Sequence, residues 1–417
     1  MTSCRELPTN RAVKNFFLCS IFYCVFWGAL AHAQSSPLAS SPWMIKPTAA
    51  VTDVLDAADK NNPFDLHIEA SYRYVRKTAQ IMRESVIAER AALSHELDYQ
   101  SVTHYLDTKL RVGLYHDLEL NAFLPIALSQ DNAWHYANGV SANNSLITVD
   151  PFTQKSLFAT PYKSYKSGLS SFDIGLSWGV FNQHRDDTKP SWTVSLSYRA
   201  PIGAAFAPVE ADPSHVNNGT DSAKRAAIGD KAHRVIFSTA LSKRFGMVEP
   251  YLSLTYRLPI VAGAAVSGYM PSHEGDMFAG IEITPWQDEQ TTQRITFDIR
   301  GISQYVSSGR VYSELTDPLR RLTLAGDYAV LGGRVAILAQ FHSYIRLVAG
   351  LDVTHQLSHF LTLESAGTDK NGNGIVDLND PQELNPYYRD YIDRPGSRFR
   401  VDKTLNLQFF ISAIATF

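Results

Sequence analysis

The chain has 417 residues, with 38 lysines and arginines against 41 aspartates and glutamates, and a formal net charge of −3. A nucleic-acid-binding protein would show a clustered basic excess, so this balance excludes a nucleic-acid partner. The three cysteines, Cys4, Cys19 and Cys24, all lie near the N-terminus, so the rest of the chain has no disulfide framework and no thiolate chemistry.

Residues 1–33 have the features of a secretory signal peptide. Three basic residues precede an apolar run over 16–30, and small residues lead to a cleavage site between Ala33 and Gln34. The run of about fifteen apolar residues is shorter than the roughly twenty that span a membrane as a helix. We therefore expect export followed by cleavage.

Residues 34–64 precede the first expected strand and form a separate N-terminal segment. Within it, 49–60 has helical propensity, with Thr52 as a possible cap. This stretch could be a short periplasmic helix or could enter a barrel lumen as a plug. Residues 77–96 also mix Arg, Glu, Ala and Leu as a helix would, in what we expect to be the first outer loop. For both stretches an extended or unstructured alternative stays open.

From residue 65 to residue 417 the sequence repeatedly alternates between apolar and polar residues. In 105–115, for example, Leu106, Leu110 and Leu114 would face one way, and Lys109 and Arg111 the other. A period of two indicates strands, and a barrel closed in lipid needs this pattern because lipid lies outside and a polar lumen inside. The expected strands cover 65–75, 100–115, 117–128, 169–180, 191–202, 232–243, 248–260, 275–286, 292–304, 334–354, 358–366 and 400–417.

The expected connections alternate between short and long, as in transmembrane barrels with short periplasmic turns and long outer loops. The fold class predicted is therefore all-β, a transmembrane antiparallel up-and-down β-barrel of about twelve strands over 65–417. One phase holds through 334–354, so we expect a single long strand there. If that segment splits and 321–330 also pairs, the barrel would have about fourteen strands.

Charged residues in the inward phase are the candidates for a lumen lining: Arg73, Lys109, Arg111, Asp173, Arg199, Arg257, Asp298, Arg300 and Arg346. They could line a conduction path, or they could form a paired network that closes the interior. In the outward phase, Trp178, Trp192 and Trp286 are candidates for an interfacial aromatic girdle. His104 and His233 also fall in outward phases, and since serines are plentiful, chance explains any Ser–His pairing. We therefore predict no enzyme.

One motif suggests a metal. Residues 369–380 match the start of an EF-hand-type loop and resemble the loops of dockerins and calcium-binding repeats, with an aspartate at the twelfth position. The predicted calcium ligands are Asp369, Asn371, Asn373, Ile375 through its carbonyl, Asp377 and Asp380. The alternative is an ordinary surface turn rich in Asn, Asp and Gly. A bound calcium would order the last outer loop.

The last thirteen residues alternate almost without exception and end on an aromatic residue. Phe409, Ile411 and Phe417 share the apolar face of this strand. This ending resembles the C-terminal signature of Gram-negative outer-membrane β-barrels, which the resemblance implies is read by the barrel insertion machinery. The arrangement is also similar to the barrels grouped near phenol-degradation-pathway and hydrophobic-compound transporters, and this implies a small apolar substrate.

These observations predict an outer-membrane β-barrel of a Gram-negative bacterium that acts as a channel or transporter for small, possibly apolar, solutes. The first alternative is a non-conducting structural or adhesive barrel with a calcium-ordered outer loop. The second is a lipid-modifying enzyme of the outer membrane. The partners expected are outer-membrane lipid, the insertion machinery and a small-molecule solute.

Overall fold

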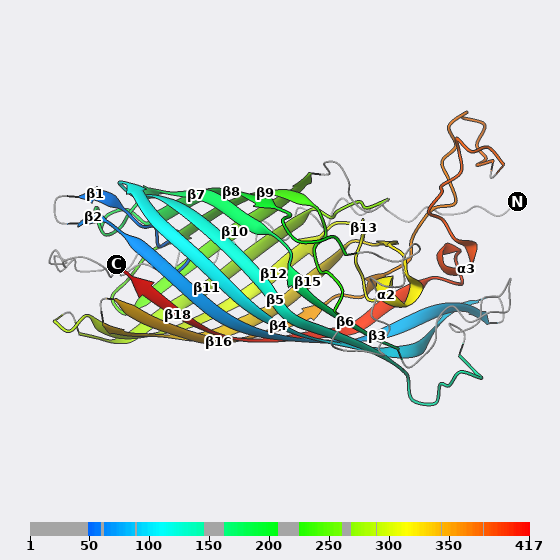
Figure 1. The fold of residues 1–417 in the computed structure, drawn as a ribbon, viewed down its shortest axis with the longest axis horizontal. Helices are drawn as coiled ribbons and strands as arrows, with labels where there is room; N and C mark the ends of the chain where they lie inside the picture. Colours follow the sequence, from blue (N-terminus) through cyan, green and yellow to red (C-terminus); the bar gives the residue numbers. More distant parts are fainter. Residues whose placement is uncertain are drawn as a thin grey trace, which may run out of the picture. The chain divides into compact units, whose positions relative to one another are not determined.

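The computed structural model describes residues 49–59, 62–87, 90–145, 162–206, 225–260, 268–288, 290–342, 344–377 and 379–417. The expected signal-peptide cleavage site, Ala33 and Gln34, lies outside them. Fourteen segments join one antiparallel sheet (Figure 1). They are β3 (Leu66–Ile87), β4 (Arg90–Tyr115), β5 (Leu118–Tyr136), β6 (Tyr162–Leu169), β7 (Phe172–Phe181), β8 (Ser191–Ala200), β9 (His233–Ser242), β10 (Val248–Ile260), β11 (Glu274–Asp288), β12 (Gln293–Val306), β15 (Tyr328–His342), β16 (Ile345–Gln356), β17 (His359–Phe360) and β18 (Phe399–Thr416).

This sheet closes into a barrel of twelve strands. β18 pairs with β16 on one side and with β3 on the other, and backbone hydrogen bonds of 2.9 and 3.0 Å join Leu66 to Phe417. β6 and β7 pair with successive parts of β5, so they are one broken strand. β17 continues β16 along β18 in the same way. Closure pairs the backbone N–H and C=O groups of the edge strands, which lipid could not hydrogen-bond.

The wall of the barrel is apolar outside and polar inside. On β12, Ile295, Phe297 and Ile299 are 37–48% exposed, whereas Thr296 and Asp298 are 2% and 1% exposed. In a water-soluble protein the apolar residues would be buried and the polar residues exposed. The same outward phase carries Leu110, Leu196, Phe237, Val335 and Phe409 on other strands. The wall is therefore built to face lipid, as the alternation predicts.

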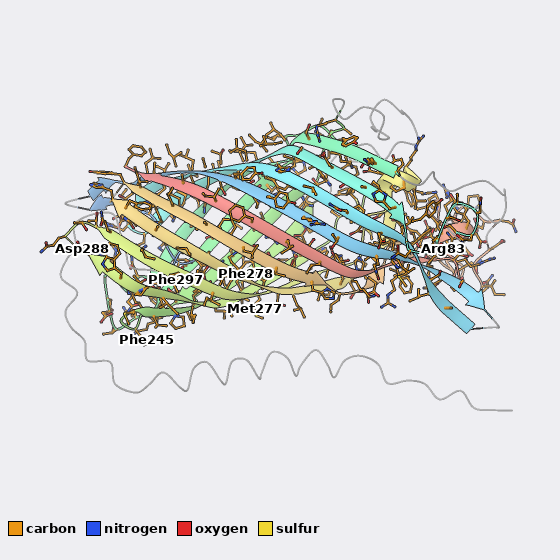
Figure 2. The ribbon with its side chains drawn as sticks, turned by 90° about the horizontal axis from the view of Figure 1, so that it is seen from below. Arg83, Phe245, Met277, Phe278, Asp288 and Phe297 are labelled. Atoms are coloured by element: carbon orange, nitrogen blue, oxygen red, sulfur yellow. The ribbon has the colours of Figure 1, made fainter. Side chains whose placement is uncertain are left out.

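The connections differ in length between the two ends of the barrel. At the short-turn end, β4 joins β5, β7 joins β8, β9 joins β10, β11 joins β12 and β15 joins β16. The opposite, long-loop end carries the connections over 137–161, 201–232, 261–273, 307–327 and 361–398. Figure 2 shows Phe245 and Asp288 at the short-turn end and Arg83 at the long-loop end.

Small elements lie off the barrel sheet. β1 (Ala57–Asp59) pairs with β2 (Asn62–Phe64), and β13 (Gly309–Val311) pairs with β14 (Thr323–Ala325). The helices α2 (Thr316–Leu319) and α3 (Asp390–Asp393) have four residues each. Among the residues that the structure describes, no helix is both long and apolar enough to cross a membrane.

The strand count of twelve is confirmed, but two of the expected strands were wrong. Residues 334–354 are not one strand, because β15 and β16 form a hairpin there. The register shifts between Gln340 and His342, and this irregularity keeps the alternation in phase across the turn. The expected strand 358–366 contributes only the two residues of β17. Within 321–330, residues 323–325 form β14 and pair with β13, and residues 328–330 are the start of barrel strand β15. The split of 334–354 adds one strand and the loss of 358–366 removes one, so the total stays at twelve.

Of the alternatives left open for 77–96, the extended one is confirmed and the helix is wrong. β3 and β4 continue as a long hairpin, in which Ala79, Ile81, Leu97 and Tyr99 are buried. Local composition favours a helix here. The strand ladder instead pairs the backbone N–H and C=O groups, and the apolar side chains that point inward are buried. The described part of 49–60 is not helical either: it makes a turn at 50–52 and then enters β1.

Candidate functional site

The inner face of the barrel and the segments that close its two ends form the candidate site. All nine charged residues selected from the sequence occupy inward positions, alternating with the exposed apolar residues of their strands: Arg73, Lys109, Arg111, Asp173, Arg199, Arg257, Asp298, Arg300 and Arg346. That they line a conduction path stays a prediction.

Most inward arginines in the middle of the barrel are ion-paired with an aspartate on the same or the next strand. The nitrogen–oxygen distance is 2.7 Å for Arg73 with Asp107 and 2.7 Å for Arg199 with Asp173. Arg257, Arg300 and Arg334 pair in the same way with Asp276, Asp298 and Asp352. The inner wall is therefore lined with ion pairs, so that each of these partly buried charges has a counter-charge beside it.

At the short-turn end, residues 49–56, called here the floor segment, cross the lumen. The amides of Ala49 and Ala50 donate to Glu249 on β10 (2.6 Å) and Glu282 on β11 (2.8 Å). On the opposite side, the amide of Leu55 donates to the Glu119 carboxylate on β5 at 3.0 Å. The floor segment is thus held by side chains from both sides of the barrel.

The floor segment fits the lumen in charge as well as in shape. Asp53 accepts a hydrogen bond from Arg111 on β4 at 2.9 Å. Burial alone would raise the pKa of Asp53, but the charges of Arg111, His67 and Arg346 outweigh it and hold the pKa well below its usual range. The backbone of Asp56 runs directly over Gly113, where an added Cβ would lie 1.9 Å from its carbonyl oxygen. Gly113 therefore leaves the space through which this backbone passes.

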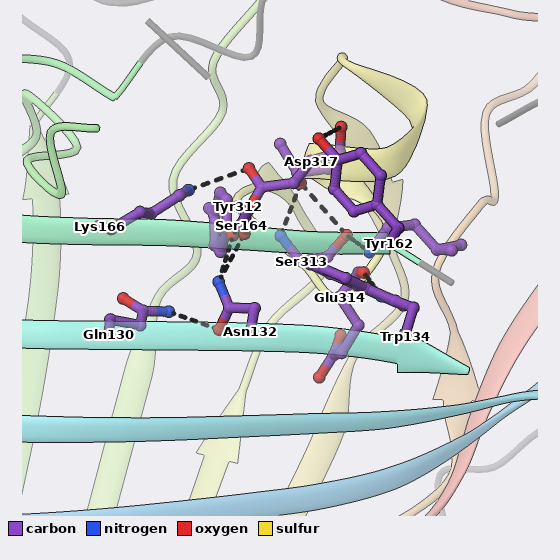
Figure 3. A network of polar contacts seen from close by, with 12 residues as sticks. Gln130, Asn132, Trp134, Tyr162, Ser164, Lys166, Tyr312, Ser313, Glu314 and Asp317 are labelled. Carbon is purple, nitrogen blue, oxygen red and sulfur yellow. Dashed lines mark hydrogen bonds and ion pairs between the residues drawn. The ribbon is translucent and has the colours of Figure 1, made fainter. Parts of the chain in front are cut away.

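At the long-loop end, residues 307–327, called here the mouth loop, fold into the barrel opening. Asp317 of α2 forms an ion pair of 3.0 Å with Lys166 on β6, and their side chains are only 2% and 6% exposed. Ser164 donates to the same carboxylate at 2.5 Å, and the hydroxyl of Tyr312 does so as well (Figure 3). Burial, together with the Asp317 charge, raises the pKa of Tyr312 well above its usual value, so the phenol remains a donor.

Two further contacts fix the mouth loop to the wall. The indole of Trp134 on β5 donates to the carbonyl of Glu314 at 2.8 Å, and the Glu314 carboxylate is paired with Lys77 on β3. Burial would raise the pKa of Glu314, but the charge of Lys77 outweighs it and lowers the pKa. None of Lys166, Glu314 and Asp317 was selected from the sequence, because their pairing joins segments about 150 residues apart and leaves no local signal.

An apolar cluster completes the closure of the mouth. Leu315 of the mouth loop packs with barrel residues and with α3, in a group that includes Ile81, Leu97, Tyr99, Trp134, Tyr162, Leu361, Ile392, Phe399 and Val401. Most of these side chains occupy the inward phase of strands that continue beyond the lipid-facing band. At this end the interior therefore combines the buried ion pairs of Lys166 and Lys77 with an apolar and aromatic cluster.

α3 contains a buried carboxyl group whose ionisation opposes folding. Asp393 is 3% exposed and accepts hydrogen bonds from the amides of Arg389 (2.8 Å) and Glu364 (3.2 Å). Burial, with some contribution from the Glu364 charge, raises its pKa to about 6, while Arg321 acts in the opposite direction.

Because this pKa is raised, the folded segment binds its proton more tightly than the unfolded one. The stability that protonated Asp393 contributes to the folded segment is complete below about pH 4 and is lost as the pH rises through about 6. A shift of about two pKa units corresponds to roughly 3 kcal/mol. We expect hydrogen-exchange protection of the Arg389 amide, corrected for intrinsic rates, to fall between pH 4 and 7. Asp393→Asn should remove this dependence, and an unchanged pH profile would contradict the assignment.

The predicted calcium ligands lie in an exposed loop. Both carboxylate oxygens of Asp369 accept backbone amides, from Gly372 and Gly374, at 2.7 Å each. The buried Glu383 accepts the amide of Asp377 at 2.8 Å. Within the described ranges, no three acidic, histidine or cysteine side chains are placed to hold one ion. Calcium binding stays a prediction from the spacing, and it would require Asp369 to exchange these amides for the ion.

If calcium binds, it should order residues 369–380. We expect calcium at about 10⁻⁴–10⁻³ M, the range of extracellular modules, to slow proteolysis of this loop in the folded barrel. Asp369→Ala should abolish the protection, whereas Asn379→Ala, which removes a side chain outside the predicted ligand set, should leave it. Equal cleavage with calcium and with chelator would contradict the prediction.

Outward histidines on the wall are bonded to tyrosines. Tyr72 and His104 are joined at 2.6 Å, and Tyr198 is hydrogen-bonded to His233. In both pairs the tyrosine hydroxyl contacts the Nδ1 atom of the imidazole ring. Trp178, Trp192 and Trp286 are outward and 36–53% exposed, near the short-turn end. Phe409, Ile411 and Phe417 are outward and 45–58% exposed, and their role as an assembly signal stays a prediction.

The comparisons with known proteins concern the fold. The sequence matches no protein-family model and no curated protein. Its structure is similar to the COG4313 outer membrane channel from Pseudomonas putida F1, with 12% identity, coverage of 84% of this chain and 95% of that one, and a TM-score of 0.37. A Pseudomonas aeruginosa FadL homologue (12% identity, 88% and 96% covered, TM-score 0.36) is also similar. So is a deltaS2 mutant of the TodX monoaromatic hydrocarbon channel (11% identity, 84% and 90% covered, TM-score 0.35).

At these identities and TM-scores the similarities carry no further argument. The chain's own strand pairing shows a closed antiparallel β-barrel with an apolar outer face, as its terminal strand and alternation predict.

Proposed function

We propose that this barrel is a gated channel for small solutes in the outer membrane of a Gram-negative bacterium, reached by signal-peptide export. The observation that carries the proposal is the floor segment, which crosses a charged lumen and is held there largely by hydrogen bonds to single side chains. A barrel with a purely structural role needs no separate segment across its lumen. The mouth loop provides a second closure at the opposite end.

The nature of the two closures supports gating. The floor segment has no strand partner in the barrel, and Glu249 and Glu282 hold it through one backbone amide each. Segments with few such contacts open locally at a much lower free energy than the strands of the sheet. Opening of the floor segment therefore leaves the barrel wall intact.

The aromatic residues at the mouth favour a small solute with an apolar body. Trp134, Tyr99 and Tyr162 are buried on the inner side at this end, and the Trp134 ring makes a tilted contact with Tyr99 and an edge contact with Tyr162, at centroid distances of 5.2 and 5.3 Å. If the mouth loop moves away, these rings become an aromatic lining. Aromatic and apolar linings with few polar groups are typical of sites for small apolar ligands.

A non-conducting structural or adhesive barrel is the second candidate. The exposed loop over 369–380 favours it, since Ile375 is 71% exposed and is available to a partner. In that case the floor segment and the mouth loop would be permanent parts of the core. The two candidates differ in whether a continuous lumen ever opens.

Single-channel recording of the refolded mature protein, residues 34–417, in planar bilayers tests the proposal. We expect a mostly closed state interrupted by discrete openings, because both closures are docked in the resting structure. A folded, heat-modifiable barrel that never conducts, even with residues 34–56 deleted, would contradict the channel and support the structural role.

A further inference from the structure

Beside the floor segment, three inward polar side chains form a row across neighbouring strands. Arg294 on β12 lies directly opposite Gln340 on β15, and Gln340 lies directly opposite Arg346 on β16. Arg294 is 7% exposed and Gln340 is 4% exposed, and Arg346 is partly buried. The row therefore sits on the lumen wall at the short-turn end.

Part of the hydrogen-bonding capacity of this row is unused. The side-chain oxygen of Gln340 is buried and has no hydrogen-bond partner. Its orientation is fixed, because the amide nitrogen donates to the carbonyl of His342 at 3.2 Å and a flipped amide would place oxygen against oxygen. Over the part of the chain that the structure describes, the guanidinium groups of Arg294 and Arg346 make no hydrogen bond or ion pair, although the carboxylates of Glu282 and Asp53 lie near Arg294.

This lack of partners distinguishes the two arginines of the row from other arginines of the barrel wall. Five arginines on the barrel wall each have their own aspartate: Arg73, Arg199, Arg257, Arg300 and Arg334. A guanidinium stays charged at any physiological pH, and buried charges are ordinarily paired. Two buried or partly buried arginines that flank an unsatisfied amide oxygen therefore have the composition of a vacant anion site.

The charges around the row limit the kind of anion. Asp53 and Glu282 lie near enough to Arg294 to attract it, while Arg244 and Arg346 repel it. Arg346 in turn acts on the Asp53 carboxylate, which is hydrogen-bonded to Arg111. With these carboxylates present the row suits a single negative charge better than a multiply charged phosphate.

We propose that Arg294, Gln340 and Arg346 form a binding site for a small organic carboxylate that also carries a hydroxyl group, and that Asp53 of the floor segment competes with it. The two arginines bind the carboxylate with charge-assisted hydrogen bonds. The hydroxyl donates to the unsatisfied oxygen of Gln340. An aromatic body on such a solute also matches the rings at the mouth. The inference rests on the proposed function, because the solute reaches this site through an open lumen.

The test uses 2-hydroxybenzoate as the probe and benzoate as the analogue that lacks the donor. Titration calorimetry is done on the refolded mature protein and on Gly113→Ala, which displaces the floor segment. We expect 2-hydroxybenzoate to bind Gly113→Ala at least tenfold more tightly than the unmodified chain, since Asp53 no longer competes. Arg294→Gln and Arg346→Gln, made in the Gly113→Ala background, should each weaken binding at least tenfold.

Gln340→Leu should reduce 2-hydroxybenzoate to the affinity of benzoate, and this comparison reads out the hydroxyl contact alone. Arg225→Gln removes an arginine outside the lumen and controls for loss of charge. Heat-modifiability of each variant establishes that the barrel is folded. A Gly113→Ala protein that conducts but binds neither probe, or binds both equally with and without Gln340, overturns this inference alone. Binding as expected in proteins that never conduct overturns the proposed function alone.

Discussion

Gly113→Ala is expected to raise the open probability of the barrel in planar bilayers by a large factor. The added Cβ would lie 1.9 Å from the Asp56 carbonyl oxygen, so the floor segment and the methyl group cannot both keep their places. Overpacking of this kind typically costs about 1–3 kcal/mol. That is enough to shift docking of the floor segment by roughly five- to more than a hundredfold.

The floor segment, not the wall, should give way in this variant. Gly113 is part of the β4 ladder, which pairs with β3 and β5, whereas residues 49–56 have no ladder partner in the barrel. Gly275→Ala is the matched control, because an added Cβ there meets nothing within 4 Å. It should conduct like the unmodified chain. Equal conductance in both variants would show that the floor segment does not gate the lumen.

Lys166→Met is expected to release the mouth loop. Removing this ammonium leaves the Asp317 carboxylate buried without its counter-charge, and breaking a buried pair typically costs about 3–5 kcal/mol. We expect new tryptic cleavage after Arg320 and Arg321, together with longer openings in bilayers. The β-barrel itself should remain folded, because the mouth loop lies outside the barrel ladder.

The double variant Lys166→Met/Asp317→Asn should recover much of the protection, since neither member of the pair is then left charged. Asp131→Asn serves as the control, because it removes an exposed partner of Arg225 and should cost less than about 1 kcal/mol. If the single and double variants are cleaved equally, the Lys166–Asp317 ion pair does not hold the mouth closed.

The sequence by itself determined the wall. Alternation at period two fixes which side of each strand faces lipid, so the inward phase of Arg73, Asp173 and Arg300 could be predicted without coordinates. The same parity placed Glu249 and Glu282 on the inner face, although nothing local shows that they bind a separate segment. The prediction from phase missed the turn after Gln340. The register irregularity there preserves the alternation that a turn usually interrupts.

Only the tertiary structure decided what occupies the lumen. Glu249 binds the amide of Ala49 across 200 positions, and Lys166 binds Asp317 across about 150. Such contacts depend on closure of the barrel, which brings distant strands around one space. Secondary structure in the lipid-facing band follows from a local rule, because lipid imposes the same pattern on every strand. The closures follow from no such rule, because charge and shape inside the lumen are matched between segments that meet only after the barrel has formed.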